Sequence, residues 1–507
     1  MRCRVVRAVL LSVVMAAVTG CVVGPNYVRP SVVTPEAYKE IDGWKVAQPQ
    51  DDALRGAWWE TFNDPPLAAL EARVSVSNQT LAAAEATYRQ ATALVREARS
   101  AYFPTVTVGI GYARQRPSST LTSATGTGVA TGTGVGTGTR GSSGPSNFFQ
   151  LPIDVAWAPD FWGKVRRSVE SSQAGAQASA ADLETARLSL QAELALDYFQ
   201  LRTLDAQRQL LDTSVTAFER SLELTRIRYE GGVASQVDVA QAQTQLETTR
   251  AQAIDVGVQR AQLEHAIALL VGQPPSSFAL PTTPLTTPPP GIPVGVPSEL
   301  LQRRPDVAAA ERRVAAANAQ IGVAIAAYYP SITLSASAGF ESSGLAQWLT
   351  WPSRFWSVGP GISQTVFDGG LRRAQTAGAR AAHEASVANY RQTVLGAFQG
   401  VEDDLAALRI LEDEARVQAQ AVAAAERSLT LTTAQYRAGT VSYLNVVTTQ
   451  TIALTNEVTA VQILGRRLTA SALLIQALGG GWRDTDLPSA QAVTQAVRNG
   501  GPAPSSR

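Results

Sequence analysis

Four short stretches of the chain alternate between apolar and small polar positions. From Thr105 to Tyr112 every second residue is Val, Ile or Tyr, and the residues between them are Thr or Gly. The same two-residue period recurs at 149–157, 332–341 and 356–363. Because successive side chains of a β-strand point to opposite faces, the pattern predicts four strands, each with one apolar face and one small, polar face.

Long stretches without proline separate these strands. No proline occurs from residue 160 to 273 or from 361 to 487. Large apolar residues after 190 recur at intervals of three, four and seven, as in helices that pack side by side as coiled coils. They are Leu194, Leu201, Leu204, Leu211, Val215, Phe218 and Leu222. The pattern predicts a helix from Trp162 to Tyr229, about 100 Å long at 1.5 Å per residue. A returning helix is predicted at 236–271 and a helix before the first strand at 66–101.

The second half of the chain repeats the first. The peptide YFPTVTV at 102–108 is similar to YYPSITL at 328–334. In the same way, RYEGGVASQVDV, which begins at 228, is similar to QYRAGTVSYLNV, which begins at 435. We therefore predict an internal tandem duplication. Extra residues of the first copy lie in a Gly-, Ser- and Thr-rich stretch at 118–146, which predicts a surface loop. A phosphate-binding loop is the alternative, but no Lys follows the glycines and no helix opens after them.

The predicted organisation has six parts. They are a lipoprotein-type signal peptide at 1–20, a lipid-anchored segment at 21–65, repeat 1 at 66–273, a linker with nine prolines at 274–297, repeat 2 at 298–480 and a C-terminal tail at 481–507.

The N-terminus has the features of a secretory signal. Arg2, Arg4 and Arg7 precede an apolar run of about 11 residues, shorter than the roughly 20 of a spanning helix. The small residues before Cys21 resemble a lipoprotein lipobox, so we expect Cys21 to become the lipid-bearing N-terminus. Val22 then occupies the position where Asp often signals inner-membrane retention, which favours the outer membrane. No second cysteine remains for a disulfide.

The charge composition gives no sign of a nucleic-acid partner. Charged residues make up 17% of the chain. Loss of the signal arginines leaves 40 basic against 42 acidic residues, so the chain has no basic excess that would bind a nucleic acid.

The sequence also gives little support for enzymatic chemistry. His265 and His383 are the two histidines, and His383-Glu384 continues to Val387 where a zinc-peptidase motif needs a second His. We predict no catalytic residue and no metal site.

The two-faced strands fit either a sandwich edge in water or an outer-membrane barrel, and the predicted anchor favours the barrel. A sheet exposed to lipid must close so that no backbone edge is unpaired. Four strands cannot close a barrel, since about eight is the practical minimum. Several chains are therefore expected to share one barrel.

Several motifs follow one another in order over nearly the whole chain. They are CVVGPNYVRP at 21–30, WWETFNDPPLAAL at 58–70, RRPDVAAAERRVAAANAQIGVAIAAYYPSITL at 303–334, FDGGLRR at 367–373 and AQYRAGTVSYLNV at 434–446. With them the chain resembles the TolC-like outer-membrane efflux proteins, in particular the lipoprotein branch typified by OprM and NodT.

This resemblance implies an α+β membrane protein that forms a homotrimer. A twelve-strand β-barrel with four strands per chain would sit in outer-membrane lipid and continue as a long α-helical coiled-coil barrel through the periplasm. The implied partners are a periplasmic adaptor and an inner-membrane pump, commonly of the resistance-nodulation-division (RND) type. The covalent lipid on Cys21 is the only expected addition, with no other cofactor.

In the family, side chains just past the hairpin turns close the periplasmic mouth. The matching turn and gate positions here are Tyr229, Gly231, Gly232, Asp238, Tyr436, Gly439, Asn445 and Thr448. Relatives often have Asp at one or both of the last two positions. This sequence has an amide and a hydroxyl there instead, so an acidic ring built from the second copy is absent. Asp238 is the remaining acidic candidate; alternatively it is a solvated residue of a helix first turn, stabilised by the helix dipole.

The sequence thus predicts a passive export duct for small molecules. Two alternatives stay open. One is the exit duct of a protein or peptide secretion system, and the other is a non-conducting coiled-coil lipoprotein, against which the four two-faced strands argue.

Overall fold

The computed structural model describes residues 22–40, 57–116, 145–285, 288–292 and 301–499. The chain divides into two compact units. Unit 1 comprises Met1–Tyr27, Leu94–Ser172 and Ala317–His383, and unit 2 comprises Val28–Ala93, Gln173–Ala316 and Glu384–Arg507. Each unit draws on both predicted copies, and the predicted division by copy stays a prediction.

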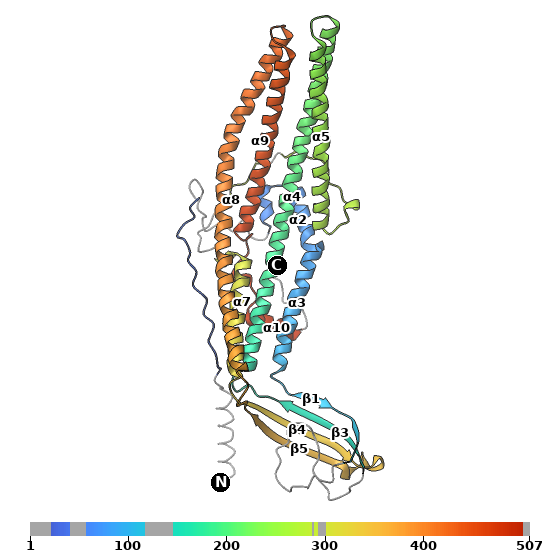
Figure 1. Cartoon of the computed structure of the whole chain (residues 1–507), viewed down its shortest axis with the longest axis vertical. Helices are drawn as coiled ribbons and strands as arrows, with labels where there is room; N and C mark the ends of the chain where they lie inside the picture. Colours follow the sequence, from blue (N-terminus) through green and yellow to red (C-terminus); the bar gives the residue numbers. More distant parts are fainter. Residues whose placement is uncertain (1–21, 41–56, 117–144, 286–287, 293–300, 500–507) are drawn as a thin grey trace. The chain divides into compact units, whose positions relative to one another are not determined.

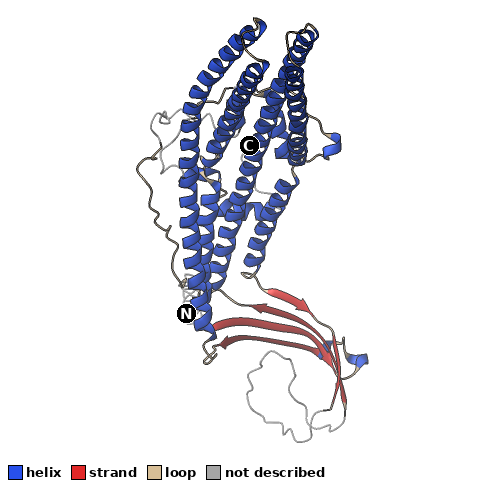
Figure 2. Ribbon diagram, turned by 45° about the horizontal axis from the view of Figure 1, so that its top comes forward, coloured by secondary structure: helices blue, strands red, loops and turns tan. Residues whose placement is uncertain are grey.

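Unit 1 contains one antiparallel sheet, drawn in red in Figure 2. Its strands are β1 (Thr105–Val108), β2 (Gly111–Gln115), β3 (Ser146–Trp157), β4 (Ser331–Ser342) and β5 (Arg354–Ser363). The order is β1-β3-β4-β5, and β2 also pairs with β3. The four alternating stretches are therefore strands, as predicted.

The first predicted strand is interrupted between β1 and β2. Both pieces pair with β3 in one continuous register, with Val108 opposite Ile153 and Gly111 opposite Gln150. The break lies beside Pro152, which has no N–H to donate to a neighbouring strand. The carbonyl of Pro152 still accepts from the Gly109 N–H at 3.0 Å, which holds the break against β3.

Two helical hairpins dominate unit 2 (Figure 1). The first joins α4 (Lys164–Glu230) to α5 (Gln236–Leu270), and the second joins α8 (Leu371–Arg437) to α9 (Tyr443–Ala477). Both first helices have 67 residues and both returning helices have 35. The predicted bounds of the first hairpin agree with the structure to within two residues.

The apolar spacing predicted for α4 forms the core of these hairpins. Leu211, Phe218 and Leu222 of α4 are buried in one cluster with residues of α5, α8 and α9. Among the described residues, α9 alone is long and apolar enough to span a membrane by length and composition, and 44% of that window is buried. Its Val446 and Leu454 belong to the same cluster, so its apolarity serves packing between helices.

The helix predicted at 66–101 is in fact two helices, α2 (Pro65–Ser77) and α3 (Gln79–Ser100). Asn78 separates them with extended backbone. Its side-chain oxygen accepts from the Thr80 and Leu81 N–H groups at 2.9 and 3.0 Å, and its amide donates to the Leu270 carbonyl at 2.8 Å. The break is therefore a capped helix start that also fastens the end of α5.

The remaining elements are short, apart from α7. They are η2 (Trp58–Phe62), η3 (Pro275–Ser277), α7 (Pro305–Ala326), η4 (Leu345–Gln347), η5 (Trp351–Ser353), η6 (Asp484–Asp486) and α10 (Ala490–Asn499). Aromatic residues of η2 pack on α4, with the Phe62 and Phe199 rings 4.8 Å apart.

The start of the predicted linker is fixed to α4 and α5 by an ion-pair network. Asp205, fully buried, accepts from Arg202 at 3.1 Å and from Arg260 at 2.7 Å. The two arginines also donate to linker carbonyls, Arg202 to Pro281 and Arg260 to Leu280, each at 2.7 Å. We call these contacts the linker clasp, since they hold a proline-rich segment through its backbone.

Candidate functional site

The turn between α4 and α5 contains the first group of predicted gate residues. The Gly232 N–H donates to the Tyr229 carbonyl at 2.9 Å, and the Val233 N–H donates to the Arg228 carbonyl at 2.8 Å. This pair of bonds is a Schellman C-cap, and Gly232 takes the left-handed conformation it requires, with φ of +73°. Gly231 donates to Ile227 as a helical residue would and has no positive φ.

The turn between α8 and α9 has the same geometry. Gly439 donates to the Tyr436 carbonyl and Thr440 to the Gln435 carbonyl, both at 3.0 Å, and the φ of Gly439 is +78°. Each of these positions is 207 residues after its counterpart in the first turn. The predicted turn glycines Gly232 and Gly439 thus have equivalent backbone roles.

The two predicted gate tyrosines, in contrast, have different surroundings. Tyr436 is buried and meets the ring of Tyr443 edge-on, with ring centres 5.2 Å apart. Tyr229 is 46% exposed. The difference arises because the first copy has Gln236 where the second has Tyr443. Tyr229 is therefore available to contacts outside the chain, and Tyr436 is part of the core.

Tyr443 connects the second hairpin to the first. It is 1% exposed, and its hydroxyl lies 2.9 Å from the Ser221 hydroxyl of α4. Burial raises the pKa of the Tyr443 phenol above its usual value. The phenol therefore stays neutral and can act as donor or acceptor toward Ser221.

Arg228 makes a second connection between the hairpins, which the sequence did not predict. Its guanidinium carbon lies 4.7 Å from the centre of the Tyr436 ring. Its Nη1 atom donates to the Arg437 carbonyl at 3.1 Å. Within the described part of the chain, Arg228 Nε and the Tyr436 hydroxyl are buried without hydrogen-bond partners. The only sequence signal is an Arg one residue before the matched Tyr229.

Asp238 forms a capping box with Ser235 at the start of α5. The Asp238 carboxylate accepts from the Ser235 N–H at 2.9 Å, and the Ser235 hydroxyl accepts from the Asp238 N–H at 3.2 Å. This arrangement gives Asp238 the helix-start role that was the alternative to a gate role. Asn445 and Thr448 are exposed on the first turns of α9, and Thr448 donates to the Leu444 carbonyl at 2.9 Å. The gate role of all three residues stays a prediction.

The predicted lipid anchor, Cys21, lies outside the described residues, but the segment that follows it is docked in unit 1. The side chain of Arg167, 4% exposed, donates to the Val23 and Gly24 carbonyls at 3.3 Å and to the Asn26 side chain at 2.9 Å. Gly24 has a φ of +96°, and a Cβ on it would come within 2.5 Å of Gly322 in α7. These contacts hold residues 23–26 against the start of α4.

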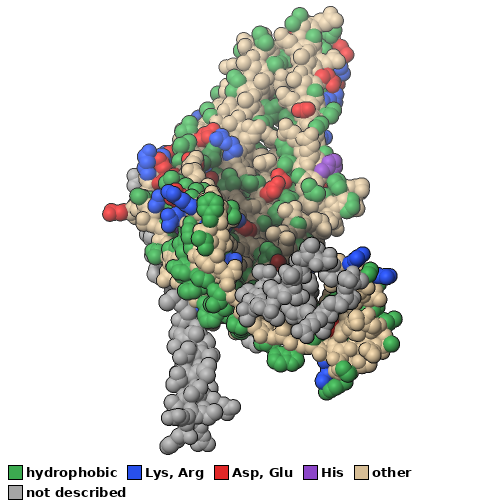
Figure 3. Space-filling model, turned by 60° about the horizontal axis from the view of Figure 1, so that its bottom comes forward, with side chains coloured by type: hydrophobic (Ala, Val, Ile, Leu, Met, Phe, Trp, Pro, Cys, Tyr) green, Lys and Arg blue, Asp and Glu red, His purple; other side chains and the backbone are tan. Residues whose placement is uncertain are grey.

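The strand register confirms the two faces predicted for the sheet. Apolar residues lie opposite one another on one face, for example Val155 opposite Ala336 and Ala336 opposite Val358. Thr333, Ser335 and Ser337 point to the other face, because side chains alternate along β4. Much of the apolar face is exposed, with Val358 at 73%. Hydrophobic side chains, green in Figure 3, are visible on the surface of the sheet.

Aromatic side chains mark both ends of this apolar face. At the end where the strands continue into helices, Trp162 stacks on Tyr329 at 4.8 Å and the Trp157 indole donates to the Tyr102 carbonyl. At the other end the rings of Tyr112, Phe149 and Trp348 follow one another at 4.9 and 5.6 Å. Two aromatic girdles flanking an apolar band are typical of outer-membrane strands.

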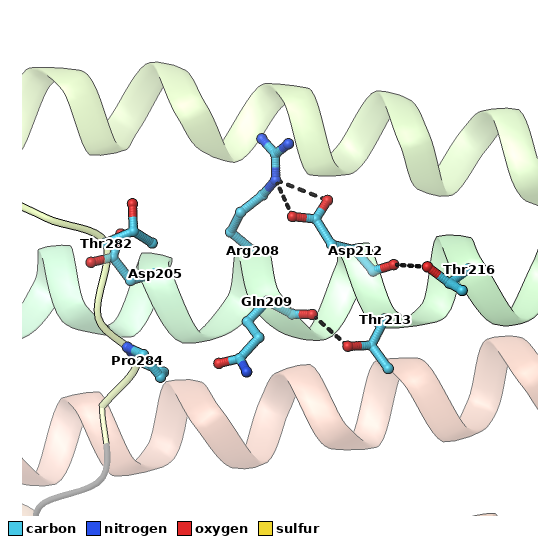
Figure 4. Close-up of a pocket in the computed structure, with 8 residues that line it drawn as sticks. All are labelled: Asp205, Arg208, Gln209, Asp212, Thr213, Thr216, Thr282 and Pro284. Atoms are coloured by element: carbon cyan, nitrogen blue, oxygen red, sulfur yellow. Dashed lines mark hydrogen bonds and ion pairs between the residues drawn. The ribbon is translucent and has the colours of Figure 1, made fainter.

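A cavity of about 540 Å³ lies beside the linker clasp, lined by Asp205, Arg208, Gln209, Asp212, Thr213, Thr216, Thr282 and Pro284 (Figure 4). Its charged groups are engaged with each other or with backbone. Arg208 Nε donates to both oxygens of Asp212 at 2.9 and 3.0 Å, and Arg208 Nη1 donates to the Ala253 carbonyl. Among the described residues there is also no cluster of His, Cys, Asp or Glu that could hold a metal ion.

The carboxyl group of Glu71 in α2, like that of Asp205, is fully buried in unit 2. Neither of its oxygens has a hydrogen-bond partner among the described residues. Burial raises the pKa of Glu71 to about 9. The carboxyl group is therefore neutral at pH 7.

The model of the family described as "Outer membrane efflux protein" matches residues 72–273 and 296–480. The chain belongs to the outer membrane efflux protein family. It is similar to the pyoverdine export outer membrane protein OpmQ of Pseudomonas aeruginosa, with 31% identity over 84% of this chain and 87% of OpmQ. It is also similar to the toluene efflux pump outer membrane protein TtgC of Pseudomonas putida, with 30% identity over 93% of this chain and 96% of TtgC.

The fold of this efflux family member matches solved channels. The outer-membrane channel OprN superposes with a TM-score of 0.81 at 30% identity, covering 91% of this chain and 100% of OprN. The mostly helical architecture with one sheet is thus that of TolC-like outer-membrane channels, as the resemblance implied. Members of the family are channels and efflux ducts rather than enzymes.

Proposed function

We propose that this efflux family protein is the outer-membrane exit duct of a tripartite efflux pump. It would passively conduct drugs or other small molecules, which an inner-membrane pump delivers through a periplasmic adaptor. Family membership and the names of OpmQ and TtgC, both outer membrane proteins of export systems, support this role. The RND class of the pump is the expectation from the sequence resemblance.

The observation that carries the proposal is the open, two-faced sheet of unit 1. In the described residues the sheet ends at β1 and β2 on one side and at β5 on the other. An exposed apolar face requires lipid, and lipid cannot satisfy unpaired strand edges. Three chains that join these edges would close a barrel of twelve strands, four from each chain. The long hairpins would continue the duct, and their equal lengths support a tandem duplication.

The hairpin turns are the proposed periplasmic mouth, where the adaptor would dock. Support comes from exposed apolar residues at the first turn, where Ile227, Val233 and Val237 are each more than half exposed. The connections from Arg228 to Tyr436 and from Ser221 to Tyr443 would hold the two hairpins of one chain together at this mouth.

We further propose that a lipid on Cys21 anchors the protein. The docked segment 23–26 supports this, because it ends close to where the strands of unit 1 pass into helices. The Val23 N–H donates to the Trp162 carbonyl at 3.3 Å, directly beside the aromatic girdle at the end where the strands continue into helices. A palmitate label that is incorporated by the natural chain and lost in Cys21→Ser would test the anchor.

The duct is tested with purified protein in planar lipid bilayers. We expect trimers with a stable ohmic conductance, and a monomer that conducts no current would overturn the proposal. Val358→Asp places a charge on the exposed apolar face and is expected to prevent insertion. Ser357→Asp, its neighbour on the small polar face, is the matched control and should still insert and conduct.

The cargo is tested separately in a deletion strain. Increased sensitivity to drugs or solvents, with an unchanged set of secreted proteins, is the expected result for an efflux duct. Loss of secreted proteins without a change in sensitivity would favour the secretion duct instead.

A further inference from the structure

Arginine residues lie on the apolar face of the sheet at its end farthest from the helices. On β2, Arg114 follows Tyr112 by two positions, so both side chains lie on the same face. On β5, Arg354 pairs directly with Phe340 of β4, which places it on that same apolar face. Both arginines are exposed, and so is Arg116, immediately after β2.

These arginines lie at one defined end of the strands. The chain enters or leaves the helices next to Thr105, Trp157, Ser331 and Ser363, which mark the proximal end of the sheet. Arg114 and Arg354 are at the opposite, distal end. The apolar face of β4 from Ile332 to Phe340 covers nine residues, and a tilted strand crosses the hydrocarbon core of a membrane with about 9–11 residues.

Exposed apolar side chains accompany the distal arginines. The connection between β4 and β5 carries Leu345, Leu349 and Trp351, which are 66, 63 and 75% exposed. The Arg354 guanidinium carbon lies 2.9 Å from the centre of the Trp351 ring, and its Nε donates to the Trp351 carbonyl at 3.0 Å. Basic and hydrophobic side chains, blue and green in Figure 3, lie together on the surface of the sheet.

We propose that Arg114, Arg354 and the exposed 345–351 connection form a binding surface for a phosphorylated glycolipid of the outer leaflet. A guanidinium at the rim of an apolar band can pair bidentately with a phosphate while its stem stays in the apolar layer. The exposed leucines and Trp351 would contact the acyl chains and the headgroup boundary. The proposal rests on the transmembrane placement of the sheet given above, with the distal end outward.

The opposite rim also carries cations, among them the exposed Arg373 near the start of α8. Lys164 begins α4 and is exposed, and it lies at the proximal end of the sheet, beyond Trp157. A lysine is a point charge that cannot form the paired hydrogen bonds of a guanidinium with phosphate. Lys164→Gln is therefore a matched control, since it removes one exposed cation from the other rim of the same band.

The test uses full-length trimers in nanodiscs of neutral phospholipid. Diphosphorylated lipid A, or the same lipid without its phosphates, is added in steps, and bound lipid is counted by native mass spectrometry. We expect the natural chain to prefer the phosphorylated form at least tenfold. The double variant Arg114→Gln/Arg354→Gln should lose most of this preference, and Lys164→Gln should keep it.

Three results would overturn the proposal. They are equal binding of the two lipids by the natural chain, an unchanged preference in the double variant, and an equal loss of preference in Lys164→Gln. Bilayer conductance of the same preparations separates refutation of the lipid-binding surface from refutation of the proposed duct function. Conducting trimers without a lipid preference would refute the lipid surface alone, whereas a natural chain that forms no conducting trimer would refute the proposed function.

Discussion

The guanidinium of Arg228 lies over the ring of Tyr436 and donates to the carbonyl of Arg437. This contact joins the last turn of α4 to the last turn of α8, and so couples the two hairpins of one chain at their turns. A hairpin that moves alone must break the contact. Arg228 is therefore positioned to hold the two hairpins together.

We expect Arg228→Ala to loosen this coupling by about 1–2 kcal/mol, because it removes a cation–π contact and one hydrogen bond. In single-channel recordings the variant should spend more time in states of higher conductance. Arg226→Ala, an exposed arginine on the same helix, is the control and should behave as the natural chain. Unchanged recordings for Arg228→Ala, or an equal change for Arg226→Ala, would contradict the role given to Arg228.

The capping box of α5 predicts that replacing either of its two residues by Ala destabilises the protein to the same extent. Asp238→Ala and Ser235→Ala should each lower the unfolding free energy by about 1 kcal/mol, because each removes the side chain that satisfies a backbone N–H. The midpoint of thermal unfolding in detergent measures this effect. The reversal potential in a salt gradient should stay the same in both variants. A shift of that potential in Asp238→Ala alone would show that the carboxylate lines the ion path, and the capping role would then be incomplete.

Glu71 predicts that stability falls as the pH rises. Its pKa is about 9 in the folded chain and near 4.5 in the unfolded chain. Between these values the folded state holds a proton that the unfolded state has lost, so stability from this group is complete below pH 4.5 and is lost progressively toward pH 9. Glu71→Gln should stabilise the protein at pH 7 by up to about 3 kcal/mol and flatten the pH dependence.

Unfolding midpoints at pH 5, 7 and 9 measure this effect of Glu71. The exposed Glu97→Gln serves as the control and should leave the pH dependence as it is. If the two variants have the same pH dependence, Glu71 does not bury a neutral carboxyl group.

The linker clasp predicts that neutralising the carboxylate of Asp205 strongly lowers the free energy of unfolding. Asp205→Asn leaves Arg202 and Arg260 without their shared anion. Because Arg202 is only 4% exposed, we expect the free energy of unfolding to fall by about 3–5 kcal/mol. Asp212→Asn breaks a half-exposed pair with Arg208 and should cost less than about 1 kcal/mol. Proteolysis within 274–285 should quicken in the first variant only. Similar unfolding midpoints for the two variants would show that the clasp does not stabilise the fold.

Helices and strands were predictable where apolar residues recur with a regular period along the sequence. The spacing of Leu211, Phe218 and Leu222 defined the buried face of α4, and the alternation from Thr105 defined the first strand. The interruption at Asn78 was missed, because a single Asn within an apolar helical period resembles a surface position. The available signal was the capping residue itself, an Asn followed at two and three positions by Thr80 and Leu81, whose N–H groups need acceptors.

Contacts between distant segments were less accessible from the sequence. The motif matched Tyr229 with Tyr436 by their positions, but burial of a ring depends on its neighbour, and only the second copy has Tyr443 beside it. The linker clasp joins Asp205 to Arg260, 55 positions away, and Arg202 to Pro281, 79 positions away, separations that no local period encodes. Arg228 was missed for the same reason, since its partners lie more than 200 residues later.

The equal lengths of α4 and α8 limit how this chain can change. Deletion of one turn from α4 alone would withdraw its glycine turn by about 5.4 Å and bring a different side chain opposite Tyr436. Insertions and deletions should therefore survive in evolution only as matched pairs, one in each half. The two halves have diverged in sequence, but each still sets the length of the other.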